Sequence, residues 1–230
     1  MSMKGNVLFL ILIAVALFAA LSYAITQSGR GSGSIDKENV VLDAARIIQV
    51  VGIAQQVIMR LKTVHGCGDD EISFDNLILP TNYDNSNAPA NKSCHFFEPE
   101  GGGLSLEQFA LHEAWEDPAK PSGASIWMQP YFSFGGMNAI QGAGSANGDL
   151  VIMLPYIKAS LCDEINRQLD IGSNNRDSNI DLASFIGTYG AVPVGDEGAG
   201  SDLAGQMMVC VDETGSSTAG NHFYSVLIAR

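Results

Sequence analysis

The chain has 230 residues, of which 46% are hydrophobic and 16% are charged. This length and this apolar share are enough for one folded domain with an appendage. The 25 acidic and 12 basic residues give a formal net charge of -13 at pH 7. Because so acidic a chain repels a phosphate backbone, nucleic acid is excluded as an expected partner.

The first predicted element is an apolar helix near the N-terminus. Residues 7–25 carry no charge, and at about 1.5 Å per residue they extend for roughly 28 Å, enough to cross a hydrocarbon core of about 30 Å. Lys4 stands ahead of this run, so the positive-inside rule places the short N-terminus in the cytoplasm and the rest outside. We therefore predict a cytoplasmic leader of residues 1–5 and a transmembrane helix over 6–27.

Three fates of this segment fit its residues. A peptidase on the cytoplasmic face could cut between Gly5 and Asn6 and leave the whole helix on the mature chain. A signal peptidase could instead cut after Ala24, since Ser22, Tyr23 and Ala24 form a small-x-small site, and the mature protein would then be soluble. An uncut helix would remain as a plain membrane anchor.

Lys4 and Gly5, directly before an apolar run, resemble the class III leader of type IV pilins and of type II secretion pseudopilins. In that family the helix after the leader is first a membrane anchor and later the packed core of a filament. The family usually has Phe or Met as the first mature residue and Glu as the fifth, whereas this chain has Asn6 and Leu10. The carboxylate that normally pairs with a neighbouring subunit's N-terminus is therefore missing.

The resemblance implies a bacterial envelope subunit that acts in filament or secretion assembly or in surface contact. Its place would be the inner membrane, with a periplasmic or extracellular domain, or a cell-surface filament. Its partners would be the membrane and other copies or other pilin-like subunits. The order of apolar helix, flexible break, amphipathic helix and compact domain is also similar to the pilin plan.

Two other classes of protein remain open. Cleavage after Ala24 would release a periplasmic or secreted binding domain, and a small extracytoplasmic hydrolase is the third candidate. For catalysis, however, His112 and Glu113 are not followed by a second histidine at metalloprotease spacing, and the chain has no Gly-x-Ser-x-Gly elbow. We therefore predict a protein that is not an enzyme and that needs no cofactor.

A flexible linker and a second helix are expected next. Residues 28–35 are rich in glycine and serine, which favour a break in the helix. Asp36 is expected to cap an amphipathic helix over 36–64 that packs on the head, with a self-associating seam as the alternative. Its apolar positions recur at steps of four and three: Val40, Ala44, Ile47, Val51, Ala54, Ile58 and Leu61.

Residues 65–230 are predicted to form an extracytoplasmic α+β head with antiparallel strands. A third helix is expected after Pro155 and is expected to stop before Gly172, and the last two strands are expected to form a terminal hairpin. Short apolar runs between Gly, Asn, Pro and Ser predict strands at 76–79, 94–97, 125–129, 131–134, 150–154, 206–211 and 223–229.

Four cysteines follow the apolar segment, at Cys67, Cys94, Cys162 and Cys210. An even number of cysteines is expected where an oxidising compartment lets thiols pair. Three pairings are open, and we favour Cys67 with Cys94 and Cys162 with Cys210. The alternative is a zinc site, because tetrahedral zinc prefers the imidazoles and thiols that are offered by His65, Cys67, Cys94 and His95.

A second candidate metal site lies in the last third of the chain. Oxygen ligands of the kind that calcium prefers stand at alternating positions, those of Asp177, Asn179 and Asp181. Some pseudopilins carry calcium in a loop of the globular domain, so the resemblance supports calcium here. The alternative is a solvated loop in which Asp181 caps a helix.

Overall fold

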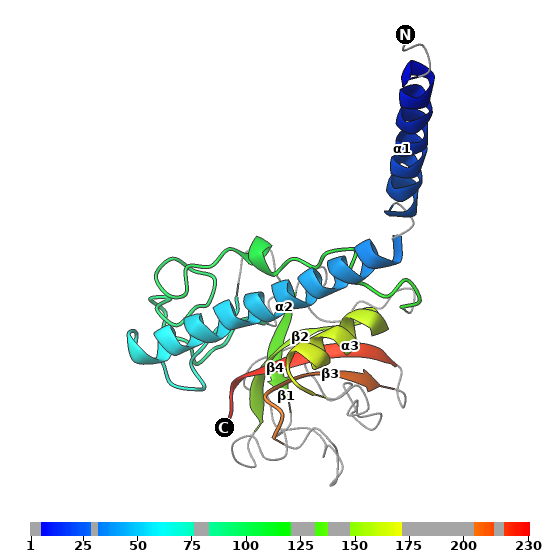
Figure 1. Cartoon of the computed structure of the whole chain (residues 1–230). Helices are drawn as coiled ribbons and strands as arrows, with labels where there is room; N and C mark the ends of the chain where they lie inside the picture. The colour runs from blue at the N-terminus through cyan, green and yellow to red at the C-terminus, as the bar shows by residue number, and fades with distance from the viewer. Residues whose placement is uncertain are drawn as a thin grey trace. The chain divides into compact units, whose positions relative to one another are not determined.

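The computed structural model describes residues 6–28, 32–75, 83–120, 132–137, 148–171, 205–213 and 219–230. The chain divides into two units, Met1–Val40 and Val41–Arg230, and each is described by itself. The elements in chain order (Figure 1) are helices α1 (Asn6–Ser28) and α2 (Ser32–Thr63), the short 3-10 helix η2 (Leu106–Phe109), strands β1 (Ser133–Met137) and β2 (Asp149–Leu154), helix α3 (Ala159–Gln168), and strands β3 (Met208–Glu213) and β4 (Gly220–Ile228).

The fold is α+β, as predicted, with one four-stranded antiparallel sheet in the order β1-β2-β4-β3. The expected terminal hairpin is present, because β3 pairs with β4 over its whole length. Both faces of the sheet are buried. One face carries Val151, Met153, Val209, Val211, Tyr224 and Val226.

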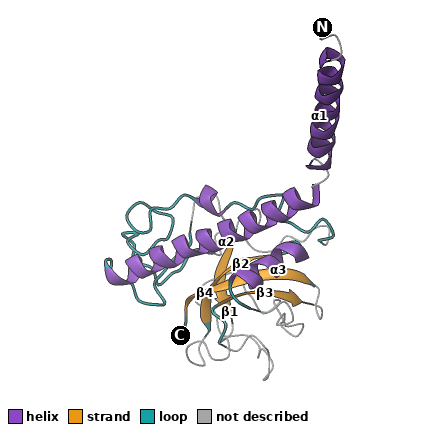
Figure 2. Cartoon of the chain, in the orientation of Figure 1, coloured by secondary structure: helices purple, strands orange, loops and turns teal. Residues whose placement is uncertain are grey.

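Helices α2 and α3 both contact the other face of the sheet (Figure 2). In α2, Gln55 donates from its side-chain amide to the Ser225 hydroxyl on β4. In α3, Cys162 is joined to Cys210 on β3. Since Cys210 lies opposite Phe223 in the ladder, and Phe223 and Ser225 are two residues apart on one strand, all three side chains share a face.

The apolar stripe predicted for α2 is confirmed. Ala44, Ile47, Val51, Ala54 and Leu61 are fully buried and Ile58 almost so, while Val40 at the start of the stripe is half-buried. The predicted start was wrong: the helix begins at Ser32, so Asp36 lies inside it and does not cap it. A glycine costs only about 1 kcal/mol in a helix, and each residue added to an existing helix gains a hydrogen bond, so Ser32, Gly33 and Ser34 can extend it.

Residues 65–75 and 83–120 form an irregular lobe that aromatic side chains hold against β1 and α2. The rings of Phe74 and Phe134 stack with centroids 4.5 Å apart, and Arg46 of α2 lies 5.6 Å above the Trp115 ring, a favourable cation-π contact. Further ring contacts tie this cluster together, between Phe74, Phe96, Phe97, Phe109, Phe132, Phe134 and Trp115.

The strand predicted at 94–97 was wrong, since only an isolated bridge links His95 to Ser73. The chain turns back directly after it, and the amide of Gly102 donates to the carbonyl of His95. A Cβ on Gly102 would lie 1.9 Å from the carbonyl oxygen of Phe96, so this approach requires glycine. Of the other expected strands, those at 76–79 and 125–129 lie outside the described residues, and the last four correspond to β1–β4 with shifted ends.

Helix α3 is fastened to the edge strand β3 at a single residue. Cys162 forms the disulfide with Cys210. One turn further along α3, the buried side chain of Asn166 donates to the carbonyl of Cys210 and accepts its amide N–H. Because β3 is at the edge of the sheet, these two backbone groups have no strand beside them, and Asn166 takes the place of a neighbouring strand.

Loss of the Cys162–Cys210 bond should destabilise the head strongly. The bond closes a loop of 48 residues, so replacing both cysteines with alanine should lower the free energy of unfolding by about 4 kcal/mol on the chain-entropy model. Urea unfolding of the full chain in detergent, followed by circular dichroism, measures this. The Cys67–Cys94 bond closes a loop of 27 residues, so the matched variant with Cys67→Ala and Cys94→Ala should lose slightly less free energy of unfolding, about 3.5 kcal/mol. Unchanged midpoints in both variants would contradict the assignment.

The side chain of Asn166 can be tested separately from the disulfide. Asn166→Leu keeps the volume but leaves the buried N–H and carbonyl of Cys210 without these partners, which should cost about 2–4 kcal/mol. The same urea titration measures the loss, and Gln168→Leu, on the same helix but partly exposed, serves as the control. Equal losses of stability in the two variants would mean that the hydrogen bonds of Asn166 to Cys210 contribute no particular stability.

Candidate functional site: the apolar helix α1

Helix α1 is apolar on every side. It runs for 23 residues, Asn6–Ser28, without an ionisable acidic or basic side chain. All its described side chains, those of residues 9–23, are exposed. The large ones range from 40% exposed for Ile13 to 73% for Phe18. A soluble surface helix normally turns polar side chains outward, so α1 presents the opposite of a water-facing surface.

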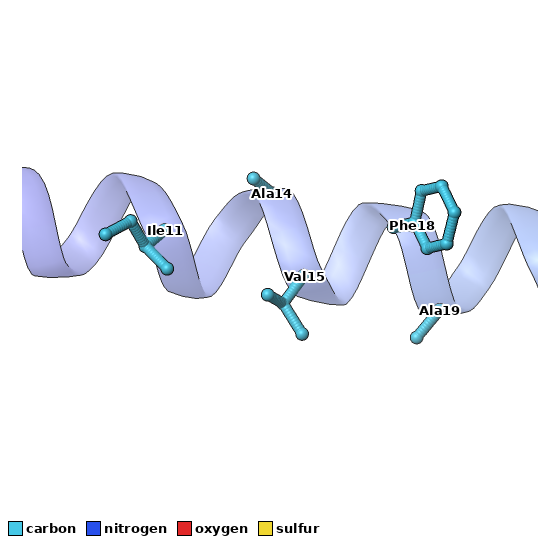
Figure 3. Close-up of a pocket in the computed structure, with 5 residues that line it drawn as sticks. All are labelled: Ile11, Ala14, Val15, Phe18 and Ala19. Atoms are coloured by element: carbon cyan, nitrogen blue, oxygen red, sulfur yellow. The ribbon is translucent and has the colours of Figure 1, made fainter.

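A hollow on α1 is lined by Ile11, Ala14, Val15, Phe18 and Ala19. These residues recur at steps of three and four and so lie along one side of a single helix (Figure 3). All five lining residues belong to α1, so the hollow is a shallow depression between large and small side chains on the surface of one helix. It is not an enclosed pocket for a small molecule, and its chemistry suits acyl chains or another apolar helix.

Among the described residues, one helix, Asp36–Thr63 of α2, is long and apolar enough to cross a membrane by length and composition, and Phe9–Tyr23 of α1 is a shorter apolar segment. In α2 one apolar stripe is buried against the head, and other faces carry charged residues such as Asp43 and Arg46. In α1 the apolar side chains lie exposed.

The predicted processing residues fall at the start and inside of α1. Lys4 and Gly5 lie outside the described residues, and Asn6 is the first residue of the helix. Ala24, the alternative cleavage site, is helical and four residues from the end of α1. A helix has to unwind locally before a peptidase can cleave it, and a cut after Ala24 would separate most of α1 from the head.

The zinc hypothesis was wrong, because the structure pairs the two sulfurs with each other. Cys67 and Cys94 form a disulfide, so neither can supply the thiolate that zinc requires. His95 is buried and His65 is exposed. The disulfides are those of the pairing favoured from the sequence. The calcium candidates Asp177, Asn179 and Asp181 lie outside the described part of the chain. Within the described part, no group of three or more His, Cys, Asp or Glu side chains could hold a metal ion.

The described ionisable groups of the head with shifted pKa values form surface ion pairs or lie in the core. A hydrogen bond from Arg167 lowers the pKa of Glu164, and one to Glu98 raises the pKa of Lys92. Burial raises the pKa of the Tyr83 hydroxyl. The two ion pairs are exposed at the cationic side chain, where such pairs contribute little to stability.

Sequence reasoning missed Asn166, whose buried side chain holds both backbone groups of Cys210. No local signal could have found it, because its partner lies 44 residues away on an edge strand.

No family model, curated protein or solved structure matches this chain.

A charge placed in α1 should weaken any association of this helix with a membrane. Leu17 lies near the middle of the helix and is 65% exposed, so Leu17→Arg would bring a guanidinium to the centre of the bilayer at a cost of about 2.5–3.5 kcal/mol. The amount of full-length protein that resists alkaline extraction from membranes should fall several-fold. Leu17→Phe is the control and should be retained; equal retention of both variants would argue against a membrane-embedded α1.

Proposed function

We propose that the protein is a pilin-like or pseudopilin-like structural subunit of the bacterial envelope. In this proposal α1 anchors the chain in the inner membrane, and the head lies in the periplasm or outside the cell, acting in filament or secretion assembly or in surface contact. The observation that carries the proposal is that α1 is uncharged over 23 residues and that all its described side chains are exposed.

Water is an unfavourable surrounding for such a helix. Burial of one Leu, Ile or Phe side chain contributes about 1.5–3 kcal/mol, and α1 exposes nine large hydrophobics between Phe9 and Leu21: Phe9, Leu10, Ile11, Leu12, Ile13, Val15, Leu17, Phe18 and Leu21. Together they favour transfer into an apolar surrounding by well over 10 kcal/mol. Lipid acyl chains, or neighbouring copies of α1, provide that surrounding.

The two disulfides support a head outside the cytoplasm. Cys162 and Cys210 are fully buried, and Cys67 and Cys94 nearly so. Both bonds join parts of the head that are distant in sequence. Structural disulfides of this kind form and persist in oxidising compartments such as the periplasm. The positive-inside rule, applied to Lys4, gives the same orientation.

The absence of a carboxylate from α1 shapes the proposal. With Leu10 where the resembling family usually has Glu, α1 can enter the bilayer without desolvating a charge. Contacts between such helices rest on van der Waals packing, which small residues such as Ala16, Ala19 and Ala20 allow. The subunit is therefore suited to stable anchoring, with specificity for its partners supplied by the head.

The N-terminal residue of the mature protein tests this function directly. Intact mass and N-terminal sequencing of protein from its native cells should give a chain that starts at Asn6. Gly5→Leu should abolish that cut, whereas Ala24→Leu, the matched control, should leave it unchanged. A start at Ile25 would overturn the proposal in favour of a released periplasmic or secreted domain, and an intact N-terminus would leave a plain anchored protein.

A further inference from the structure

The two disulfides of the head join the cysteines in the order in which they occur along the chain. Cys67 is bonded to Cys94, the first to the second, and Cys162 is bonded to Cys210, the third to the fourth. All four cysteines lie among the described residues, and none is free. Four cysteines can pair in three ways, and this is the one in which neither loop crosses or encloses the other.

In the folded head the four cysteines are out of reach of another protein. The exposed fraction of the residue is 5% for Cys67, 1% for Cys94 and 0% for both Cys162 and Cys210. In thiol–disulfide exchange a thiolate attacks a disulfide sulfur directly and forms a mixed disulfide, so the attacking sulfur must be accessible. An oxidising protein can therefore reach these cysteines only before the head has folded around them.

The contacts that align each pair belong to the folded head. Asn166 on α3 holds both backbone groups of Cys210, so docking of α3 brings the sulfur of Cys162 to β3 and covers it in the same step. In the first pair, the amide of Ser73 donates to the carbonyl of Cys94 at the isolated bridge. While the cysteines are still accessible these contacts are absent, and the choice of partner must depend on something else.

Order of export supplies this choice. With α1 inserted as proposed above and Lys4 on the cytoplasmic side, the head crosses the membrane beginning at its N-terminal end. Cys67 and Cys94 then reach the oxidising side before Cys162 and Cys210 do. The first and the third cysteine each meet their native partner as the next thiol to arrive.

Loop length favours the same pairs, but only weakly. The native loops of 27 and 48 residues are both shorter than the stretch between Cys94 and Cys162. Each doubling of loop length costs only about 0.6 kcal/mol of closure entropy, so loop length alone would leave a share of the chains mispaired. Export in order excludes those pairs, because the competing thiols have not yet arrived when the first bond closes.

We infer that a dithiol oxidase outside the cytoplasm forms both disulfides on the unfolded chain, in the order of the cysteines, so that the head needs no disulfide isomerase. This inference rests on the location of the head in the proposed function. The thiolate of Cys67 attacks the disulfide of the oxidase, and one oxidase sulfur leaves as a thiolate. The thiolate of Cys94 then attacks the Cys67 sulfur of the mixed disulfide and releases the other. The head loses two electrons and two protons, and the oxidase gains them as a dithiol.

Disulfide mapping of the full chain tests the need for each enzyme. The chain is produced in bacterial cells that lack either the dithiol oxidase or the disulfide isomerase of the extracytoplasmic space. Free thiols are alkylated before lysis, and the peptides are mapped without reduction. Cells without the isomerase should give both native pairs at the wild-type level, whereas cells without the oxidase should give several-fold fewer paired chains.

A fifth cysteine tests the order itself. Ser86→Cys places an exposed thiol between the two cysteines of the first pair, so in cells without the isomerase it should be captured by Cys67 and leave Cys94 free. Ala229→Cys is the matched control, since it is also exposed but follows all four natural cysteines. Its added thiol should stay free while both native pairs form. With the isomerase present, Ser86→Cys should regain the native pairs.

Two results would overturn the inference and leave the proposed location of the head intact. Native pairs in Ser86→Cys without the isomerase would mean that the head folds before it is oxidised. Capture of the added thiol by Cys94 in Ser86→Cys, or by Cys210 in Ala229→Cys, would mean that loop length and not chain order selects the partner. Four free thiols in wild-type chains from cells that have both enzymes would instead overturn the location, and the inference with it.

Discussion

The head depends on the burial of one stripe of α2. This helix supplies six apolar side chains that are almost completely removed from water, from Ala44 to Leu61, and it contacts both the sheet and the irregular lobe. Gln55 reaches Ser225 and the carbonyl of Val226 on β4. Arg60 donates to the carbonyls of Gly101 and Gly102 in the lobe. Without α2, the sheet would lose a cover and the lobe would lose the element that aligns it.

The two covalent links complement this packing where regular structure is sparse. Among its described residues the lobe has the 3-10 helix η2 and two isolated bridges, so its backbone hydrogen bonds lie mostly in turns and not in a ladder. The Cys67–Cys94 bond fixes its first turn, after α2, to the bridge beside His95. The Cys162–Cys210 bond and Asn166 secure the edge strand instead. Each disulfide thus stands at a place where a ladder of backbone bonds is lacking.

Periodic features could be predicted from the sequence, and features that depend on distant contacts could not. The stripe of α2, the terminal hairpin and the third helix follow from apolar spacing and from glycine-rich turns. The turn after residues 94–97 depends on the close approach of Gly102 to Phe96, and the role of Asn166 depends on an edge strand 44 residues away. The helical start at Ser32 was missed because composition describes local preference and not the gain from extending a long helix.

Of the candidate site, α1 could be predicted because its composition alone sets it apart: residues 7–25 carry no charge. The exposure of its side chains could not be predicted in this way, because exposure depends on whether another part of the chain covers them. In α2 the apolar stripe is buried, whereas all described side chains of α1 are exposed. The two helices thus differ in what covers them, and this difference, more than apolar content, is what makes α2 a part of the head and leaves α1 for the proposed anchor.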